Sequence, residues 1–419
     1  MPSVVEELRK REAKVLSTSY VRPYPFVPRR GEGAWLEDVE GRRYLDFMGG
    51  IAVNTTGYAH PRVLAAAREQ MERFVHVCFS DFTHEPLVSL AERLVAKLGG
   101  GYRVYFGNSG TEAIEAAIKL VRYHTRRPYL LAFTGAFHGR TLGSLSLTAS
   151  NARYRAGFAP LLPGVVHVPF PSPSHPPFGV APERAGEAVL THLEHLFSTK
   201  LPPEEVAAFF VEPIQGEGGY LLPAPGFFAE LKKLLERHGI LLVADEIQTG
   251  AGRTGTFLAM EQEGVRPDLV TLAKGLASGF PLSALLFLEE LSSWPPGAHG
   301  TTFGGNPVAG AAAHATLDLL EEGLMANARR VGALLLEELT ARLAGRPSVR
   351  EVRGRGLMLA VEFADPGLRD RAVRGAFEAG LLTLPAGPNA LRIAPPLVLS
   401  EDEARQGAGI LEEVVAALG

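Results

Sequence analysis

Short runs of apolar residues without polar alternation mark the middle of the chain, from residue 102 to about residue 284. They cover residues 104–106, 129–133, 207–211, 240–244 and 269–273, and helical patterns separate several of them. Strands that have no polar residue at every second position are buried on both faces, as in a parallel sheet covered by helices. We therefore predict a large central α/β domain built on a parallel sheet.

The two ends of the chain carry shorter and more mixed patterns. A helical pattern opens the chain and ends before Arg22, and another follows Pro307 and runs to about residue 343. Ser400, with Glu403 three residues on, starts a last helix with a capping box. Short strand patterns lie at 34–36, 43–47, 358–363 and 391–393. We predict an N-terminal segment (1–60) that packs with a small α+β domain (311–419), beside a large domain (61–310).

Composition limits the classes of function. The chain has 42 Lys and Arg against 46 Asp and Glu, a net charge of −4 that argues against nucleic-acid binding. Its single cysteine, Cys78, excludes an internal disulfide and a Cys-rich metal site. The N-terminus lacks the apolar core of a signal peptide, and no apolar run reaches the roughly 18 residues of a membrane span. We expect a soluble, cytoplasmic protein with no bound metal.

Two local patterns suggest functions that the rest of the sequence does not support. Residues 241–246 are similar to the magnesium-binding strand of a P-loop ATPase, but the sequence contains no Gly-x-x-x-x-Gly-Lys-Ser/Thr motif. Residues 250–255 fit the Gly-x-Gly-x-x-Gly pattern of dinucleotide sites. Polar residues interrupt the preceding strand, however, and no acidic residue stands about 20 positions on in a second strand. We expect neither an ATPase nor a dehydrogenase.

Charged side chains stand at the ends of two predicted strands. Asp245 and Glu246 follow the run 240–244, and Lys274 follows the run 269–273. Because ligands bind at the carboxyl ends of the strands in an open parallel sheet, a carboxylate and an amine could face one crevice here. Solvated residues where a strand meets a loop would produce the same pattern.

A predicted strand is followed by a small-residue turn and a strong helix pattern at residues 106–120. This order places unpaired backbone N–H groups and the hydroxyls of Ser109 and Thr111 at a helix N-terminus, which is an anion site. Simple N-capping by either hydroxyl is the alternative. An anion site, a strand-end aspartate and a strand-end lysine are together what pyridoxal phosphate chemistry requires. We therefore predict this cofactor, with Phe137 stacked on its ring.

At these positions the sequence resembles the class III (ω-amino acid) aminotransferases of the fold-type I pyridoxal enzymes, from about Arg30 to Leu399. The segments that carry the resemblance are 108–113, 137–141, 212–219, 245–250, 271–275, 302–307 and 391–396. The resemblance implies an α/β fold, with a mostly parallel seven-stranded sheet in the large domain and a small α+β domain. It also implies a homodimer whose active sites are shared across the interface.

The resemblance assigns roles around the cofactor, pyridoxal 5′-phosphate. Lys274 is implied to form the imine with the cofactor and to carry the proton, Asp245 to pair with the pyridine nitrogen, and Gln248 to reach the ring hydroxyl. Thr302 is expected to reach the phosphate that is bound by the partner subunit. The other cofactor-binding residues expected are Ser109, Gly110 and Thr111 at the phosphate, and Phe137, His138, Glu212 and Ile247.

The resemblance also assigns substrate contacts. Arg392 is implied to clamp an α-carboxylate through two hydrogen bonds, and Glu217 to neutralise Arg392 when the amino donor has no carboxylate there. Arg140 stands where 4-aminobutyrate enzymes hold the far carboxylate of the substrate. Ile51 occupies the place of a tyrosine in ornithine δ-transaminases, which favours a donor similar to 4-aminobutyrate.

We therefore expect a ping-pong aminotransferase that moves the amino group of a 4-aminobutyrate-like ω-amino acid to 2-oxoglutarate. Two alternatives use the same cofactor. Acetylornithine and ornithine transaminases belong to the same family, and acetylornithine enzymes share the local pattern at Ile51. Residues 78–85 resemble a branch that includes amino-acid racemases. A non-catalytic binding module is a third class, and the presence of Lys274, Asp245 and Arg392 argues against it.

Overall fold

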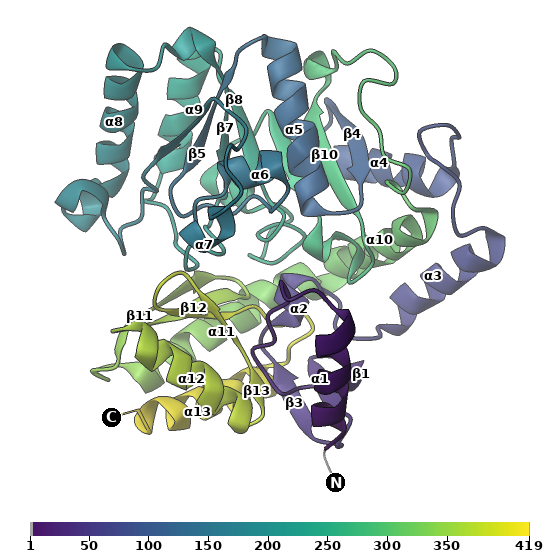
Figure 1. Cartoon of the computed structure of the whole chain (residues 1–419), viewed down its shortest axis with the longest axis vertical. Helices are drawn as coiled ribbons and strands as arrows, with labels where there is room; N and C mark the ends of the chain where they lie inside the picture. The colour runs from purple at the N-terminus through teal and green to yellow at the C-terminus, as the bar shows by residue number, and fades with distance from the viewer. Residues whose placement is uncertain (1–2, 419) are drawn as a thin grey trace.

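The computed structural model describes residues 3–418. In the described part of the chain, one seven-stranded sheet and two four-stranded sheets form the framework. Figure 1 shows the large sheet with its helices in the upper part of the molecule and the smaller sheets below it. No helix of residues 3–418 has the length and apolar character needed to cross a membrane.

The large sheet has the strand order β4-β10-β9-β8-β7-β5-β6. β10 is antiparallel to both of its neighbours, and the pairs from β9 to β6 are parallel. All five predicted strands are present; β6 and β10 are not among the predicted runs. The strands are β4 (Tyr102–Gly107), β5 (Tyr129–Phe133), β6 (Val165–Val168), β7 (Val206–Val211), β8 (Leu241–Asp245), β9 (Leu269–Leu272) and β10 (Ser283–Leu288).

Burial on both faces explains the uninterrupted apolar runs. Successive residues of a strand point to opposite faces, and Phe209 and Phe210 of β7 are both fully buried. Phe209 packs with residues of α8 (Ala185–Thr199) and α9 (Phe227–His238), whereas Phe210 packs with α5 (Gly110–Thr125). The prediction of a sheet covered by helices on both faces is confirmed. The carboxylate of β8, Asp245, stands at the strand end, where the candidate site lies.

The N-terminal and C-terminal segments share one sheet. β1 (Pro28–Glu32), β2 (Trp35–Asp38) and β3 (Arg43–Asp46) pair antiparallel, and β13 (Leu381–Leu382) adds in parallel to β3. The Tyr24 ring stacks on Phe377 at 4.6 Å between ring centroids. Figure 1 shows these elements side by side at the lower end of the molecule. The exact domain boundaries, at residues 60 and 310, stay a prediction.

The second small sheet has the order β11-β12-β15-β14 and is antiparallel throughout. Its strands are β11 (Val349–Arg355), β12 (Met358–Phe363), β14 (Leu384–Ala386) and β15 (Ala390–Ile393). Ala360 of β12 faces Arg353 on one side and Arg392 on the other. Directly paired residues share a face of a sheet, so the two arginines project from the same face, separated by one small residue.

The prediction of one continuous helix after Pro307 is wrong. The pattern from Pro307 to about residue 343 is divided into α10 (Pro307–Leu319), a π-helical turn (Leu320–Leu324) and α11 (Met325–Leu343). The backbone leaves helical geometry at Gly323, because glycine has no Cβ to restrict its backbone and is a poor helix former. The other α-helices are α1 (Val4–Val15), α2 (Gly49–Ala52), α3 (Pro61–Arg73), α4 (Glu85–Lys97), α6 (Leu142–Leu147), α7 (Ala152–Arg155), α12 (Pro366–Glu378) and α13 (Glu401–Ala416).

Close packing of α11 on the turn at Gly356 generates a stability prediction. A Cβ at Gly332 would lie 2.2 Å from the carbonyl oxygen of Gly356, and this backbone cannot yield without moving β12. We expect Gly332→Ala to lower the free energy of unfolding by about 2 kcal/mol in urea titrations. Gly409 of α13 has open space around its Cβ position, so Gly409→Ala is the control and should stabilise by up to about 1 kcal/mol. Equal changes in the two variants contradict the packing argument.

Candidate active site

The carboxyl ends of β8 and β9 open onto a cavity of about 210 Å³. Asp245 is the last residue of β8, and Lys274 lies two residues beyond β9. Both line the cavity, so the structure brings the strand-end carboxylate and amine together. Nine of the eleven residues that we expect to bind the cofactor line it: Gly110, Thr111, Phe137, His138, Glu212, Asp245, Ile247, Gln248 and Lys274.

The Asp245 carboxylate is buried and held on several sides. Oδ2 accepts a hydrogen bond of 2.7 Å from Nδ1 of His138, and Oδ1 accepts from the Ile247 N–H at 3.1 Å and the Thr271 hydroxyl at 3.3 Å. Burial alone would lower the pKa of His138, but its hydrogen bond to Asp245 and the charge of that carboxylate raise it. His138 therefore donates to Asp245 and fixes its orientation, while Nε2 of His138 is buried without a partner among residues 3–418.

Lys274 supplies a primary amine on the other side of the cavity. Burial lowers the pKa of Lys274 from its ordinary value, and the charge of Glu217 opposes this shift while that of Arg392 adds to it. A lowered pKa increases the fraction of neutral amine, which is the form that acts as a nucleophile or accepts a proton. Glu217 and Arg392, which have the largest charge effects on Lys274, are the pair assigned to substrate contacts, and the charges of Asp245 and Glu212 also raise its pKa.

The N-terminus of α5 is free of side-chain caps. Ser109 stands at the N-cap position but makes no capping hydrogen bond, and its hydroxyl donates to Oε2 of Glu112 at 3.0 Å. Capping by Ser109 is therefore wrong, and the backbone N–H groups of the first turn are available to an anion. The Thr111 hydroxyl lies 2.7 Å from that of Thr141 and 2.6 Å from that of Ser144.

Glu212 joins two loops at the edge of the cavity. Its carboxylate accepts hydrogen bonds from the N–H groups of Phe137 at 2.7 Å and Gly216 at 2.8 Å. Burial raises the pKa of Glu212 to about 7. Gln248, on the opposite wall, accepts a hydrogen bond of 2.8 Å from the Tyr220 hydroxyl. Sequence reasoning missed Tyr220 and Thr271; the only signal for Thr271 is a polar residue within an apolar strand.

Arg392 and Glu217 form an ion pair beside this cavity. Nη1 of Arg392 lies 2.5 Å from Oε1 of Glu217, and both side chains are largely buried. Nε of Arg392 is buried and has no partner among the described residues. The guanidinium of Arg140 is exposed and lies 4.2 Å from the centre of the Tyr154 ring and 5.8 Å from that of Phe137. Arg392 thus keeps hydrogen-bonding capacity for a further ligand.

Six of the expected residues do not line the cavity: Ser109, Thr302, Ile51, Arg140, Glu217 and Arg392. Ser109 lies at the start of α5 just outside it, and Thr302 is exposed on a loop. Ile51 is 42% exposed and lies in a turn where Gly50, Ile51 and Ala52 all have positive φ, with 69° at Ile51. A β-branched residue in this left-handed region is strained, and such strain is found mainly at ligand sites.

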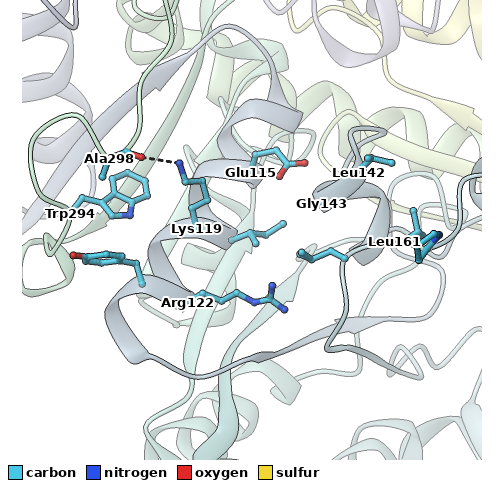
Figure 2. Close-up of a pocket in the computed structure, with 12 residues that line it drawn as sticks. Glu115, Lys119, Arg122, Leu142, Gly143, Leu161, Trp294 and Ala298 are labelled. Atoms are coloured by element: carbon cyan, nitrogen blue, oxygen red, sulfur yellow. Dashed lines mark hydrogen bonds between the residues drawn. The ribbon is translucent and has the colours of Figure 1, made fainter.

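A cavity larger than this one lies elsewhere. Figure 2 shows this space of about 700 Å³ between α5, the segment around Leu161 and the loop that carries Trp294. Lys119 closes one side by donating to the carbonyl of Ala298 at 2.9 Å. None of the expected site residues lines it. Size alone would therefore misplace the site, whereas the chemistry of the lining residues places it at the ends of β8 and β9.

Comparison with known proteins gives consistent matches along the chain. The model of the family "Aminotransferase class-III" matches residues 17–415. An alanine/serine racemase from Pyrococcus horikoshii is 42% identical, covering 98% of this chain and 90% of the relative. The 4-aminobutyrate aminotransferase of Escherichia coli is 39% identical, with 97% of each chain covered. The PLP-bound structure of an amine transaminase from an uncultivated Pseudomonas species has a TM-score of 0.91 at 32% identity, covering 97% of this chain and 98% of that one.

The fold and these matches first define the class: the protein is a fold-type I enzyme whose cofactor is pyridoxal 5′-phosphate. More narrowly, the chain belongs to the class-III aminotransferase family. The cavity fits the cofactor on its own chemistry. It offers an anchored carboxylate, an amine with a lowered pKa and a helix N-terminus without a side-chain cap, which are the three groups that pyridoxal phosphate requires.

Glu246 follows Asp245 but points away from the cavity. Its carboxylate accepts hydrogen bonds from the Thr249 hydroxyl and from the Met260 N–H at 2.8 Å. Burial raises the pKa of Glu246 to about 7. Glu246 is therefore a structural residue, although its position at the end of a strand is similar to that of Asp245.

The raised pKa of Glu246 predicts a pH dependence of stability. The unfolded chain releases this proton near the ordinary pKa of 4.5, whereas the folded protein holds it to about 7. Folding therefore loses stability as the pH rises through this window. Glu246→Gln retains an acceptor for Met260 but cannot ionise, so its unfolding free energy should rise relative to the wild type between pH 4.5 and 7. Urea titrations across this range measure the difference, and a constant difference contradicts the assignment.

Proposed function

We propose that this enzyme transfers the amino group of a 4-aminobutyrate-like ω-amino acid to 2-oxoglutarate in two half-reactions. The observation that carries the proposal is the ion pair of Arg392 and Glu217 beside Lys274. A substrate with an α-carboxylate, such as 2-oxoglutarate, can replace Glu217 at the guanidinium. A donor without a carboxylate at that position can bind with the ion pair closed.

The bound cofactor supplies an aldehyde that reacts with amines and a ring that accepts electrons from the neighbouring carbon. Lys274 is the residue that holds the cofactor and moves a proton from the amine-bearing carbon of the donor, and its lowered pKa suits this role. Asp245, oriented by His138, holds the ring nitrogen in its protonated form. The N–H groups of Gly110 and Thr111 at the start of α5 bind the phosphate.

The remaining expected residues shape the cofactor site. Phe137 covers one face of the ring, with its backbone fixed by Glu212. Gln248 directs its amide to the ring hydroxyl, and its own carbonyl is occupied by Tyr220. The side chain of Ile247 packs against the N-terminus of α5 so closely that a Cβ at Gly110 would come within 2.8 Å of it. Gly110 therefore permits the close approach of the two elements.

We also propose that two copies of the chain share their sites. Thr302 is exposed, and a group of exposed apolar side chains lies around its loop. Phe303 is 63% exposed, and its ring lies 5.1 Å from that of His76, next to the exposed Val75. Apolar surface of this kind is typical of an interface. Thr302 would then reach the phosphate of the partner subunit.

Arg140 and Ile51 complete the proposed substrate site. Arg140 stacks on Tyr154 at the rim of the cavity, where its guanidinium can pair with the far carboxylate of 4-aminobutyrate or 2-oxoglutarate. Ile51 offers an apolar wall where an ornithine-type donor would require a polar group. Acetylornithine is the alternative to 4-aminobutyrate as the amino donor.

The roles of Lys274 and Asp245 predict separable defects. Lys274→Ala should abolish the visible absorbance of the lysine-bound cofactor and lower kcat by at least about a thousandfold, because both the bond and the proton carrier are lost. Asp245→Asn should keep the absorbance but lower kcat strongly, since the amide cannot hold the ring proton. Lys233, an exposed lysine paired with Glu230, provides the control Lys233→Ala. A colourless wild type that takes up no pyridoxal phosphate overturns the proposal.

A racemase is the second candidate, because the alanine/serine racemase relative is 42% identical to this chain. The two reactions differ in their need for a keto acid. We expect 4-aminobutyrate with 2-oxoglutarate to yield glutamate, and L-alanine or L-serine alone to keep its configuration. Chiral chromatography of both mixtures measures the outcome. Formation of the D-amino acid without a keto acid, together with no glutamate from 4-aminobutyrate, assigns the enzyme as a racemase.

A further inference from the structure

Two buried arginines project from one face of the sheet β11-β12-β15-β14, but their hydrogen-bond and ion-pair partners differ. Arg353 of β11 and Arg392 of β15 both face Ala360 of β12, so they lie roughly 10 Å apart across two strand spacings. Arg392 has Glu217 as its ion-pair partner and a buried Nε without a hydrogen bond among the described residues. Arg353 uses all three of its nitrogens. It is therefore unable to bind a substrate carboxylate.

The contacts of Arg353 lead to the loop that carries Glu217. Nη1 donates to Glu351 at 2.7 Å and to Glu362 at 2.5 Å, which neutralises the guanidinium permanently. Nη2 donates to the carbonyl of Gly219 at 2.7 Å, and Nε to that of Tyr220 at 3.1 Å. The side chain of Arg353 is only 5% exposed. One fixed guanidinium thus holds two successive carbonyls of the loop.

The backbone of Glu217 is held from other directions as well. The N–H of Gly387, between β14 and β15, donates to the carbonyl of Glu217 at 2.7 Å. At the base of the loop, Gln215 and Leu221 exchange two backbone hydrogen bonds of 3.1 Å. The loop backbone from 215 to 221 is consequently pinned at its base and at three carbonyls. A movement of Glu217 away from Arg392 is therefore left to rotation of its side chain.

The same loop connects the substrate ion pair with the cofactor cavity. Tyr220 is buried, and its backbone carbonyl is held by Arg353 while its hydroxyl donates to Gln248. Its φ of 54° lies in the left-handed region, which a non-glycine residue adopts only when its surroundings enforce it. The clamp at the carbonyls of Gly219 and Tyr220 supplies that enforcement.

We propose that Arg353 is a positioning residue for substrate selection: it fixes the backbone of residues 217–220, so that Glu217 opens and closes the Arg392 site by side-chain rotation alone. This inference rests on the proposed function, in which Arg392 receives an α-carboxylate. Loss of the clamp lets Glu217 drift from Arg392 and leaves that guanidinium uncompensated. The kcat/KM for donors without a carboxylate at this position then falls, whereas the kcat/KM for substrates that bring their own carboxylate does not.

Arg353→Lys is the sharpest variant for testing the clamp. A lysine keeps a positive charge beside Glu351 and the buried Glu362, so both carboxylates stay paired, but it cannot donate to both carbonyls at once. Arg355→Lys is the matched control, because Arg355 stands on the same strand but does not contact the loop. Its guanidinium pairs with Glu263 at an N–O distance of 2.9 Å. Thermal unfolding and cofactor absorbance establish that both holoenzymes are folded and loaded.

The kinetic readout is the ratio of kcat/KM for 4-aminobutyrate to kcat/KM for glutamate. Arg353→Lys should lower this ratio about tenfold, which corresponds to the loss of one hydrogen bond to a charged group, and Arg355→Lys should leave it within about twofold. Glu217→Gln should lower the ratio as well. The double variant with Arg353→Lys should match Glu217→Gln alone, because Arg353 acts through Glu217. Equal losses for both substrates in Arg353→Lys overturn the proposal.

Hydrogen exchange provides a readout that is independent of catalysis. In the holoenzyme, amides of residues 216–221 should exchange at least several times faster in Arg353→Lys than in Arg355→Lys. Unchanged exchange in this segment overturns the clamp. If Glu217→Gln leaves the substrate ratio unchanged, or the wild type uses no donor that lacks an α-carboxylate, the proposed function fails instead. The exchange measurement still decides whether Arg353 holds the loop.

Discussion

The fixed carboxylate of Asp245 is the constraint on which the site depends. A buried charge is tolerated only where hydrogen bonds replace water, and His138, Ile247 and Thr271 supply them at the carboxyl end of β8. These donors come from three separate segments that the parallel sheet brings to one edge. Because the Asp245 carboxylate cannot turn away, the cavity keeps a negative charge on the wall formed by Asp245 and a reactive amine on the wall formed by Lys274. The sheet order therefore determines the chemistry.

Buried arginines join the large sheet to the smaller ones. Arg253 is fully buried and donates to the carbonyls of Leu357 and Pro395, while Arg353 donates to those of Gly219 and Tyr220. Arginine suits this task because its planar fork makes several hydrogen bonds with little loss of side-chain freedom. Arg392 differs in having a carboxylate partner on a loop. That difference separates an arginine that supports the structure from one that is able to respond to a substrate.

Much of the fold could be predicted because strands that are buried on both faces appear in the sequence as uninterrupted apolar runs. β5 and β7 are apolar throughout, β8 is apolar up to Asp245, and β9 contains Thr271 as its one polar residue; Asp245 and Lys274 stand where the runs of β8 and β9 end. β6 is a half-buried edge strand containing His167, which weakens its pattern. The break at Gly323 is hidden because helical periodicity continues on both sides of it. Arg353 and Tyr220 escape prediction because their contacts depend on the register of β11, β12 and β15, which no local pattern encodes.

The most direct test of the account is to locate the covalent link between the protein and its cofactor. The holoenzyme is treated with borohydride, which makes the bond between the lysine and the cofactor permanent, and the digested peptides are analysed by mass spectrometry. The account predicts a single modified peptide that carries the phosphopyridoxyl group on Lys274. Modification of another lysine, or an unmodified Lys274 in cofactor-saturated protein, would contradict the assignment of the cavity at the ends of β8 and β9.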